Sequence, residues 1–218
     1  MSLFASLLRD FRRTASDLPG LFSGHFCVMF LPLAPLLGDE ATLPGYYSDR
    51  TYFCRLRETY TDPLAPYRCK KQLKAGRCVI LELDGLGSFV FTNHYHSALF
   101  QNLQRKFPGV TSYVFCSDGP GGYFKILKDG RIQRKIASYM WSDGVGSYAE
   151  TRGAPCAYEL ETGHIFKVDP KARHLREMMP DFTKREVLDL FDYYVGLDRF
   201  QSEALRRTLV YDLESPNT

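Results

Sequence analysis

The sequence predicts an α+β fold, in which an antiparallel sheet packs with an N-terminal helix, a central helix and a C-terminal helix pair. Three observations lead to this prediction. The chain of 218 residues contains 16 Phe and 14 Tyr, and aromatic side chains suit half-buried sheet surfaces. Residues 111–138 alternate in polarity around an Asp129-Gly130 turn, which is typical of an antiparallel meander. Apolar residues recur at helical spacing near both ends and in the middle of the chain.

The composition is that of an ordinary globular protein, with 44% hydrophobic and 24% charged residues. The net charge of +3 comes from scattered Lys and Arg residues, whereas nucleic-acid-binding proteins usually carry a stronger, clustered excess. This balance argues against nucleic acid as a partner. We expect one domain over residues 1–218, and the loop-forming prolines at 63–66 mark the place where it could divide.

The N-terminal residues 1–18 are expected to form an amphipathic helix that docks on the domain, because their apolar residues recur at helical spacing. Several arginines and few acids are also typical of a targeting peptide, and that alternative stays open. Residues 21–38 are apolar enough to suggest a membrane span, but Pro32 and Pro35 would break a helix there. We expect instead a buried strand over residues 26–30 and no membrane partner.

The middle of the chain is expected to alternate between strands and one helix. Dense β-branched and apolar residues predict strands at 51–57, 77–83 and 88–92, and helical spacing predicts a helix over 96–107. In the meander that follows, Lys125, Gln133 and Lys135 form the solvent side, and the apolar side comprises Phe124, Ile126, Ile132 and Ile136.

The C-terminal part is expected to be a loop, two edge strands and two helices. Residues 142–155 have loop composition, and 157–160 and 164–168 could add short strands. Thr183 and Glu186 form a capping box at the start of a helix that Gly196 ends. The second helix is expected over residues 199–212.

The six cysteines include no Cys-x-x-Cys pair, so neither a zinc ribbon nor a thioredoxin-type motif is indicated. Their scatter leads us to expect reduced, mostly buried thiols in a cytoplasmic protein. The even number leaves disulfides open.

His94 and His96 are the strongest candidates for metal chemistry. On a strand both would lie on one face, as in some zinc sites. They fall, however, at the junction between a predicted strand and a predicted helix, and no motif supplies a third ligand. We therefore expect no metal and no cofactor, and keep a metal-assisted hydrolase using these two histidines as the alternative function.

The glycine-rich stretch 117–122 does not form a phosphate-binding motif, because it lacks the following Lys-Ser/Thr and precedes a strand. No Gly-x-Ser-x-Gly sequence is present either. These observations favour a protein that is not an enzyme.

Aromatic and arginine residues in and near the loops are the candidates for binding. Tyr, Trp and Arg are enriched at binding hot spots, although aromatics of this kind also cap the edges of a core. A further hypothesis is nucleic-acid binding through Arg131, Arg134 and Lys135, which predicts a steep salt dependence. The candidate binding residues are Tyr139, Trp141, Tyr148, Arg131 and Arg134.

Over residues 97–161 the chain resembles small bacterial immunity proteins of polymorphic-toxin systems. The resemblance rests on a helix, a strand, a hairpin and a Gly-x-Pro…Glu segment, with Asp129, Gly130, Arg134, Gly153, Pro155 and Glu159 as its motif residues. It implies a cytoplasmic protein that binds and blocks a cognate toxin. Charge complementarity would make that toxin neutral or mildly acidic. The partner's identity and the oligomeric state stay open.

Overall fold

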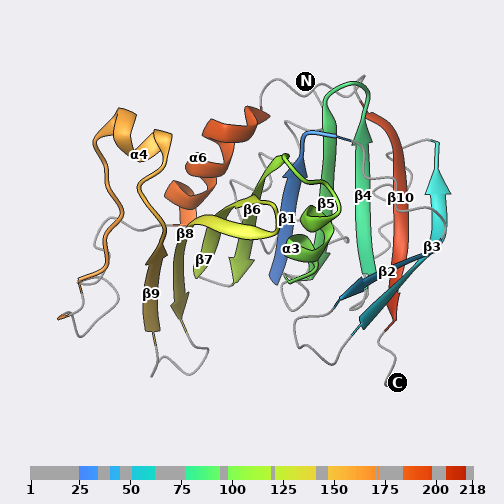
Figure 1. Cartoon of the computed structure of the whole chain (residues 1–218), viewed down its shortest axis with the longest axis horizontal. Helices are drawn as coiled ribbons and strands as arrows, with labels where there is room; N and C mark the ends of the chain where they lie inside the picture. The colour runs from blue at the N-terminus through green and yellow to red at the C-terminus, as the bar shows by residue number, and fades with distance from the viewer. Residues whose placement is uncertain are drawn as a thin grey trace.

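One antiparallel sheet of ten strands dominates the computed structural model (Figure 1). The structure describes residues 25–33, 40–44, 51–61, 77–93, 98–118, 121–140, 147–169, 171, 184–197 and 205–214. The strands are β1 (His25–Leu31), β2 (Glu40–Pro44), β3 (Thr51–Tyr60), β4 (Arg77–Leu83), β5 (Gly87–Asn93), β6 (Thr111–Asp118), β7 (Gly121–Lys128), β8 (Arg131–Met140), β9 (Ser147–Arg152) and β10 (Leu205–Glu214). The described helices are α3 (Ala98–Arg105), α4 (Ala157–Thr162) and α6 (Lys184–Val195).

The strand order in the sheet is β2-β3-β10-β4-β5-β1-β6-β7-β8-β9. The first described strand, β1, lies in the interior between β5 and β6, and the last, β10, is inserted between β3 and β4. Segments from both ends of the chain therefore share one continuous sheet, which includes residues on both sides of 63–66. The loop 63–66 itself lies outside the described residues.

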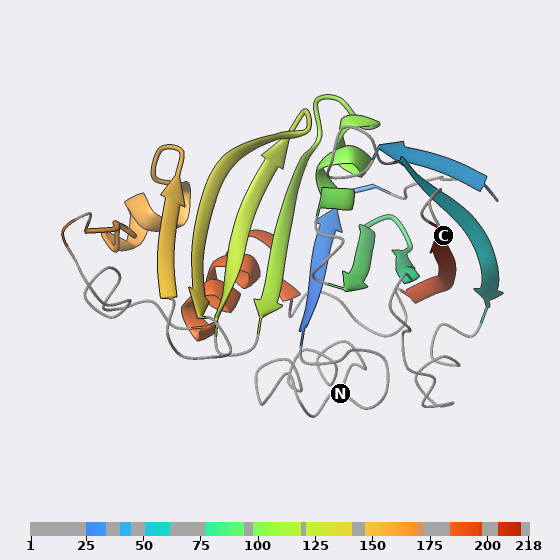
Figure 2. The ribbon, with the colours of Figure 1, turned by 90° about the horizontal axis from the view of Figure 1, so that it is seen from below.

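Both faces of the sheet carry a buried apolar layer. We call them the α6 layer, which includes Val28, Phe115 and Phe191, and the α3 layer, which includes Met29 and Leu103. Successive residues of the inner strands alternate between the two layers. Figure 2 shows α3 on one side of the sheet and α6 on the other. The inner strands consequently bury apolar side chains at consecutive positions, as residues 27–31 of β1 do.

The α+β fold class predicted from the sequence is wrong, because the sheet dominates, with ten strands against three helices in the described part of the chain. One cause is the second C-terminal helix, expected over residues 199–212: residues 205–212 belong to β10, and 199–204 lie outside the described residues. Leu209, Tyr211 and Leu213 belong to the α3 layer, while Val210 belongs to the α6 layer. In a strand buried on both faces, a short apolar run fits a helix as well as a strand.

Three shorter segments also differ from expectation. Residues 142–155 were expected to be a loop, but Ser147–Arg152 forms the edge strand β9. Residues 157–160, expected to be a strand, begin the helix α4, and 164–168 has no regular structure.

The remaining element predictions are confirmed where the structure describes them. The strand 77–83, the Asp129-Gly130 hairpin, the central helix and the helix ended by Gly196 are all present. The expected N-terminal helix lies outside the described residues. None of the described helices has the length and apolar character needed to span a membrane.

A disulfide joins Cys27 on β1 to Cys116 on β6, so the expectation of reduced thiols is wrong for these two residues. They are register partners on adjacent strands, which brings their sulfur atoms together. Both residues are 0% exposed. Cys78 and Cys156 are both buried.

Candidate functional site

The hairpin between β7 and β8 is fixed against the end of α3. Asp129 and Gly130 both have positive φ, 53° and 68°, as a two-residue hairpin turn requires. The Gly109 N–H donates to Asp129 Oδ1 over 2.7 Å, and the Gly130 N–H donates to Gln104 Oε1. A Cβ atom at Gly130 would lie 2.0 Å from Cγ of Arg105. The hairpin motif thus sets how β7 and β8 meet the helix.

A β-bulge then decides which way Arg134 faces. Ile126 pairs with Arg134, but the next pair is Leu127 with Ile132, so Gln133 is the extra residue on β8. A bulge of this kind reverses the alternation of side chains along a strand. As a result Ile132 packs on the α3 layer, although the sequence placed it with Ile136. Arg134 lies on the α6 side and is only 4% exposed.

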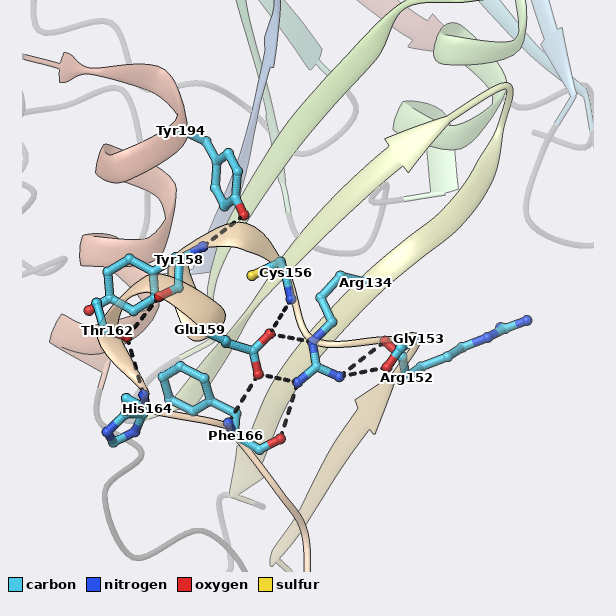
Figure 3. Close-up of polar contacts among 10 residues, drawn as sticks. All are labelled: Arg134, Arg152, Gly153, Cys156, Tyr158, Glu159, Thr162, His164, Phe166 and Tyr194. Carbon is cyan, nitrogen blue, oxygen red and sulfur yellow. Dashed lines mark hydrogen bonds and ion pairs between the residues drawn. The ribbon is translucent and has the colours of Figure 1, made fainter.

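Arg134 forms a bidentate ion pair with Glu159 of α4 (Figure 3). Its Nε donates to Oε2 over 2.8 Å and its Nη2 donates to Oε1 over 2.5 Å. The guanidinium also donates to the carbonyl oxygens of Gly153 (3.0 Å), Phe166 (3.1 Å) and Arg152 (3.5 Å). A guanidinium has five N–H donors, and each of them has an acceptor here.

The carboxylate of Glu159 is equally well satisfied. Besides Arg134, it accepts from the backbone N–H of Cys156 over 2.8 Å and from that of Phe166 over 3.0 Å. Cys156 is the residue that caps α4, so Glu159 reaches back to the helix start as in a capping box. Burial by itself would raise the pKa of Glu159, but the hydrogen bonds from Arg134 and Cys156 outweigh it, and the pKa lies below its usual value. Glu159 is therefore ionised near neutral pH.

This network ties three segments of chain to β8. It holds the residues after β9 through Gly153, the start of α4 through Glu159, and the segment after α4 through Phe166. Gly153 has a φ of +86°, and a Cβ there would lie 1.9 Å from the carbonyl oxygen of Gln133. Only glycine lets the chain pass this close to the bulge.

Tyrosines bind α4 to α6 and to the sheet. The Tyr158 N–H donates to the hydroxyl of Tyr194 over 3.3 Å. The Tyr158 ring meets the Tyr193 ring edge-on at 5.3 Å, and Tyr194 stacks on Tyr113 of β6 at 4.9 Å. Edge-on and offset aromatic pairs stabilise beyond their buried area. The tyrosines therefore hold α4 against α6, and α6 against β6 of the sheet.

Several apolar residues are exposed on the turn that carries α4 and on the adjoining part of α6, beside Glu161, which accepts a hydrogen bond from the Tyr193 hydroxyl. Leu160 of α4 is 66% exposed and Tyr193 of α6 is 43% exposed. Ala154, Pro155 and Ala157 are exposed as well. We call Ala154, Pro155, Ala157, Leu160 and Tyr193 the α4 surface.

The residues predicted to bind a partner do not form one site. Positions 139 and 148 are register partners at one end of β8 and β9. Arg131 lies at the other end of β8, about 25 Å away at strand rise, and it is exposed. Arg134 lies in the interior, with its donors used inside the protein. Trp141 lies outside the described residues.

Catalytic chemistry has little support in this region. Burial raises the pKa of the Cys156 thiol, so it is protonated and a poor nucleophile near neutral pH. His94 and His96 lie outside the described residues. Within the part of the chain that the structure describes, no group of three or more His, Cys, Asp or Glu residues could hold a metal ion.

Comparisons with models of protein families, with curated proteins and with solved structures find no match for this chain. The sequence pattern had singled out Arg134, Gly153 and Glu159 through the resemblance, without indicating that they touch. It missed Leu160 and Tyr193. The sequence offered a signal only for Leu160. It is an apolar residue between two acidic ones, Glu159 and Glu161, on a segment that was expected to be a strand.

Proposed function

We propose that the protein is a module that binds another protein stoichiometrically. More specifically, we propose that it is an immunity protein that binds and neutralises a cognate toxin. The observation that carries the proposal is the α4 surface. Leu160 is exposed on a turn that a buried, fully bonded ion pair holds in place, and Tyr193 is exposed on α6, with its ring against that of Tyr158. Large apolar side chains on an ordered surface are typical of protein contact sites.

Pre-organisation makes this surface suitable for tight binding. Ordering a loop on association costs free energy that is subtracted from the affinity. Here the backbone of the turn is already fixed by Gly153, Glu159 and Phe166, so little ordering remains. Tyrosine is also among the residues that contribute most to binding when a partner buries them.

The motif residues of the resemblance support the same proposal, because Arg134, Gly153 and Glu159 are the residues that hold the turn. A cytoplasmic location is part of the proposal. It requires the Cys27–Cys116 disulfide to resist cytoplasmic reductants, and the complete burial of both residues favours this.

The test uses the protein encoded by the gene immediately upstream, where an immunity protein would have its toxin. We expect co-expression of this chain to restore viability and calorimetry to give a 1:1 complex. Leu160→Ser with Tyr193→Ala should weaken binding by about tenfold or more. The control is Leu86→Ser in the β4–β5 turn, whose leucine is 38% exposed and lies outside the α4 surface. Failure to bind or to protect would contradict the proposal.

A further inference from the structure

The two segments that form the α4 surface are acidic. Residues 153–163, which contain α4, include two glutamates and no Lys or Arg. Residues 186–197, which follow the basic pair Lys184-Arg185 at the start of α6, include three carboxylates and again no Lys or Arg. The side chain of Arg152, directly before the first segment, points away from α4 (Figure 3). The local charge is therefore opposite in sign to the net charge of +3 of the whole chain.

Two of these carboxylates border the exposed apolar side chains. Glu161 follows Leu160 in α4 and accepts a hydrogen bond from the Tyr193 hydroxyl. Asp189 lies four residues before Tyr193 on α6, so the two share a helix face. Both Glu161 and Asp189 are exposed. In the part of the chain that the structure describes, neither of them forms an ion pair with a cationic side chain. Both are therefore available to a partner.

The pKa values of Tyr158 and Tyr193 reflect these charges. The hydrogen bond to Glu161 raises the pKa of Tyr193. Burial raises the pKa of Tyr158, and the negative charge of nearby Asp189 raises it further. Both carboxylates therefore act on this pair of rings, which meet edge-on at 5.3 Å. The bond to Glu161 also fixes the exposed ring of Tyr193, so that a partner does not have to order it on binding.

We infer that the α4 surface binds a basic, partly apolar segment of its partner protein. The inference rests on the proposed function, because it names what that surface contacts. A guanidinium group stacks on aromatic rings and donates paired hydrogen bonds to carboxylates. Tyr193 and Glu161 offer a ring and a carboxylate in direct contact, and Asp189 adds a second carboxylate. Leu160, next to Glu161, gives apolar residues of the same segment a side chain to bury.

The same charges argue against an acidic segment or a nucleic acid at this surface. Carboxylates or phosphates would face Glu161 and Asp189, and like charges brought together in an interface weaken binding. The net charge of the whole chain led us to expect a neutral or mildly acidic toxin. Net charge acts at long range, however, and salt screens exposed charges beyond roughly 10 Å. A toxin that is neutral overall can still present a basic segment to the α4 surface.

Fluorescence anisotropy with two labelled octapeptides tests the inference without any toxin. One peptide alternates leucine with arginine, and the other alternates leucine with glutamate. We expect the parent protein to bind the arginine peptide about tenfold more tightly than the glutamate peptide, or better. Glu161→Gln/Asp189→Asn should bind the arginine peptide about tenfold more weakly than the parent does. The glutamine in this variant can still accept the bond from Tyr193, so the loss reports on charge.

The control removes the same charge from two exposed carboxylates outside the α4 surface, Asp84→Asn/Asp129→Asn. Asp84 lies in the β4–β5 turn and Asp129 in the β7–β8 turn, and asparagine suits both places. An asparagine at 129 can also accept the bond that the Gly109 N–H donates. This variant should bind the arginine peptide within about twofold of the parent, because salt screens charges that lie away from the contact.

A charge reversal guards against a variant that does not fold. Glu161→Lys/Asp189→Lys should bind the glutamate peptide more tightly than the parent does, which a simple loss of structure would not produce. Three results would overturn the inference: no preference of the parent for the arginine peptide, equal losses in the surface and control variants, or no gain on charge reversal.

The peptide assay and the toxin assay can fail separately. If the chain protects against the upstream protein but shows no preference for the arginine peptide, the inference is wrong and the proposed function stands. If the peptide results hold but the chain neither binds nor protects against that protein, the immunity function is wrong and the basic segment belongs to another partner.

Discussion

At the scale of single residues, the pair of Arg134 and Glu159 matters most for stability. Both side chains are almost fully buried, at 5% and 0% exposure, and every polar atom of the two charged groups has a partner. A satisfied buried pair contributes little by itself, but removing one member leaves a charge in the interior with nothing to compensate it. The cost of breaking the pair is therefore much larger than its net contribution.

We predict that Arg134→Met lowers the free energy of unfolding by about 3–5 kcal/mol, measured by urea denaturation at pH 7. Because the pKa of Glu159 is lowered in the folded protein, its ionisation stabilises the fold above the ordinary pKa of a glutamate. That contribution is lost as pH falls through the lowered value. The difference between the parent and Arg134→Met should consequently shrink on acidification.

The control is the ion pair of Arg57 and Asp212, which has the same chemistry on the surface, with side-chain exposures of 46% and 31%. Arg57→Met should cost about 1 kcal/mol or less. Similar losses for the two variants would mean that burial does not set the energetics of the Arg134 pair.

At the scale of elements, the bulge in β8 and the turn after β9 form one unit. Gln133 at the bulge and Gly153 at the turn approach so closely that no Cβ fits between them. The bulge turns Arg134 toward the α6 side, and the turn brings Glu159 to meet it. Neither element alone would produce the ion pair.

We predict that Gly153→Ala is strongly destabilising, well beyond the cost of about 1–2 kcal/mol of a left-handed backbone alone. The added methyl group would meet a backbone oxygen at 1.9 Å, so β8 or the turn must shift and the Arg134 contacts with them. Thermal unfolding followed by circular dichroism measures the effect.

Gly163→Ala is the matched control, since Gly163 has a φ of +71° but no atom within 4 Å of an added Cβ. It should lose only the cost of the left-handed conformation. If the two variants lose the same stability, the close approach at Gly153 is not what the fold requires.

The sequence correctly predicted those elements that are determined by interactions between neighbouring residues. The Asp129-Gly130 turn and the helix ended by Gly196 were predicted because turn and cap residues act over a few positions. The strand β10 was not, because its burial on both faces depends on β3 and β4, which are far away in the chain. The helix α4 was missed because it has only six residues, and because Glu159 at its start is held by Arg134 of the distant strand β8.

The candidate site shows the same division between local and long-range signals. The sequence pattern included Arg134 and Glu159, yet their contact joins residues 25 positions apart and depends on the Gln133 bulge. In a strand of mixed polarity such as β8, the sequence does not reveal which residue is the extra, unpaired one of a bulge. The exposure of Leu160 likewise follows from the packing of α4 on α6, which spacing along the chain does not reveal.

At the scale of the whole molecule, the sheet is held together by long-range pairings around β1. This strand comes first among the described elements, and it joins the half of the sheet that ends in β2 to the half that ends in β9. The disulfide from Cys27 to Cys116 crosses from β1 to β6 and links residues 89 positions apart. A crosslink that closes so long a loop restricts the unfolded chain strongly.

We predict that Cys27→Ala/Cys116→Ala lowers the free energy of unfolding by about 2–5 kcal/mol, measured in urea without reductant. Cys78→Ala is the control, because it also removes a buried sulfur but leaves the Cys27–Cys116 disulfide in place, and it should lose less. Adding reductant to the unfolded parent should bring its stability on refolding close to that of the double variant. In the denatured, unreduced parent, no more than four of the six cysteines should react with a thiol reagent. Reaction of all six would show that the two halves of the sheet are held by strand pairing and packing alone.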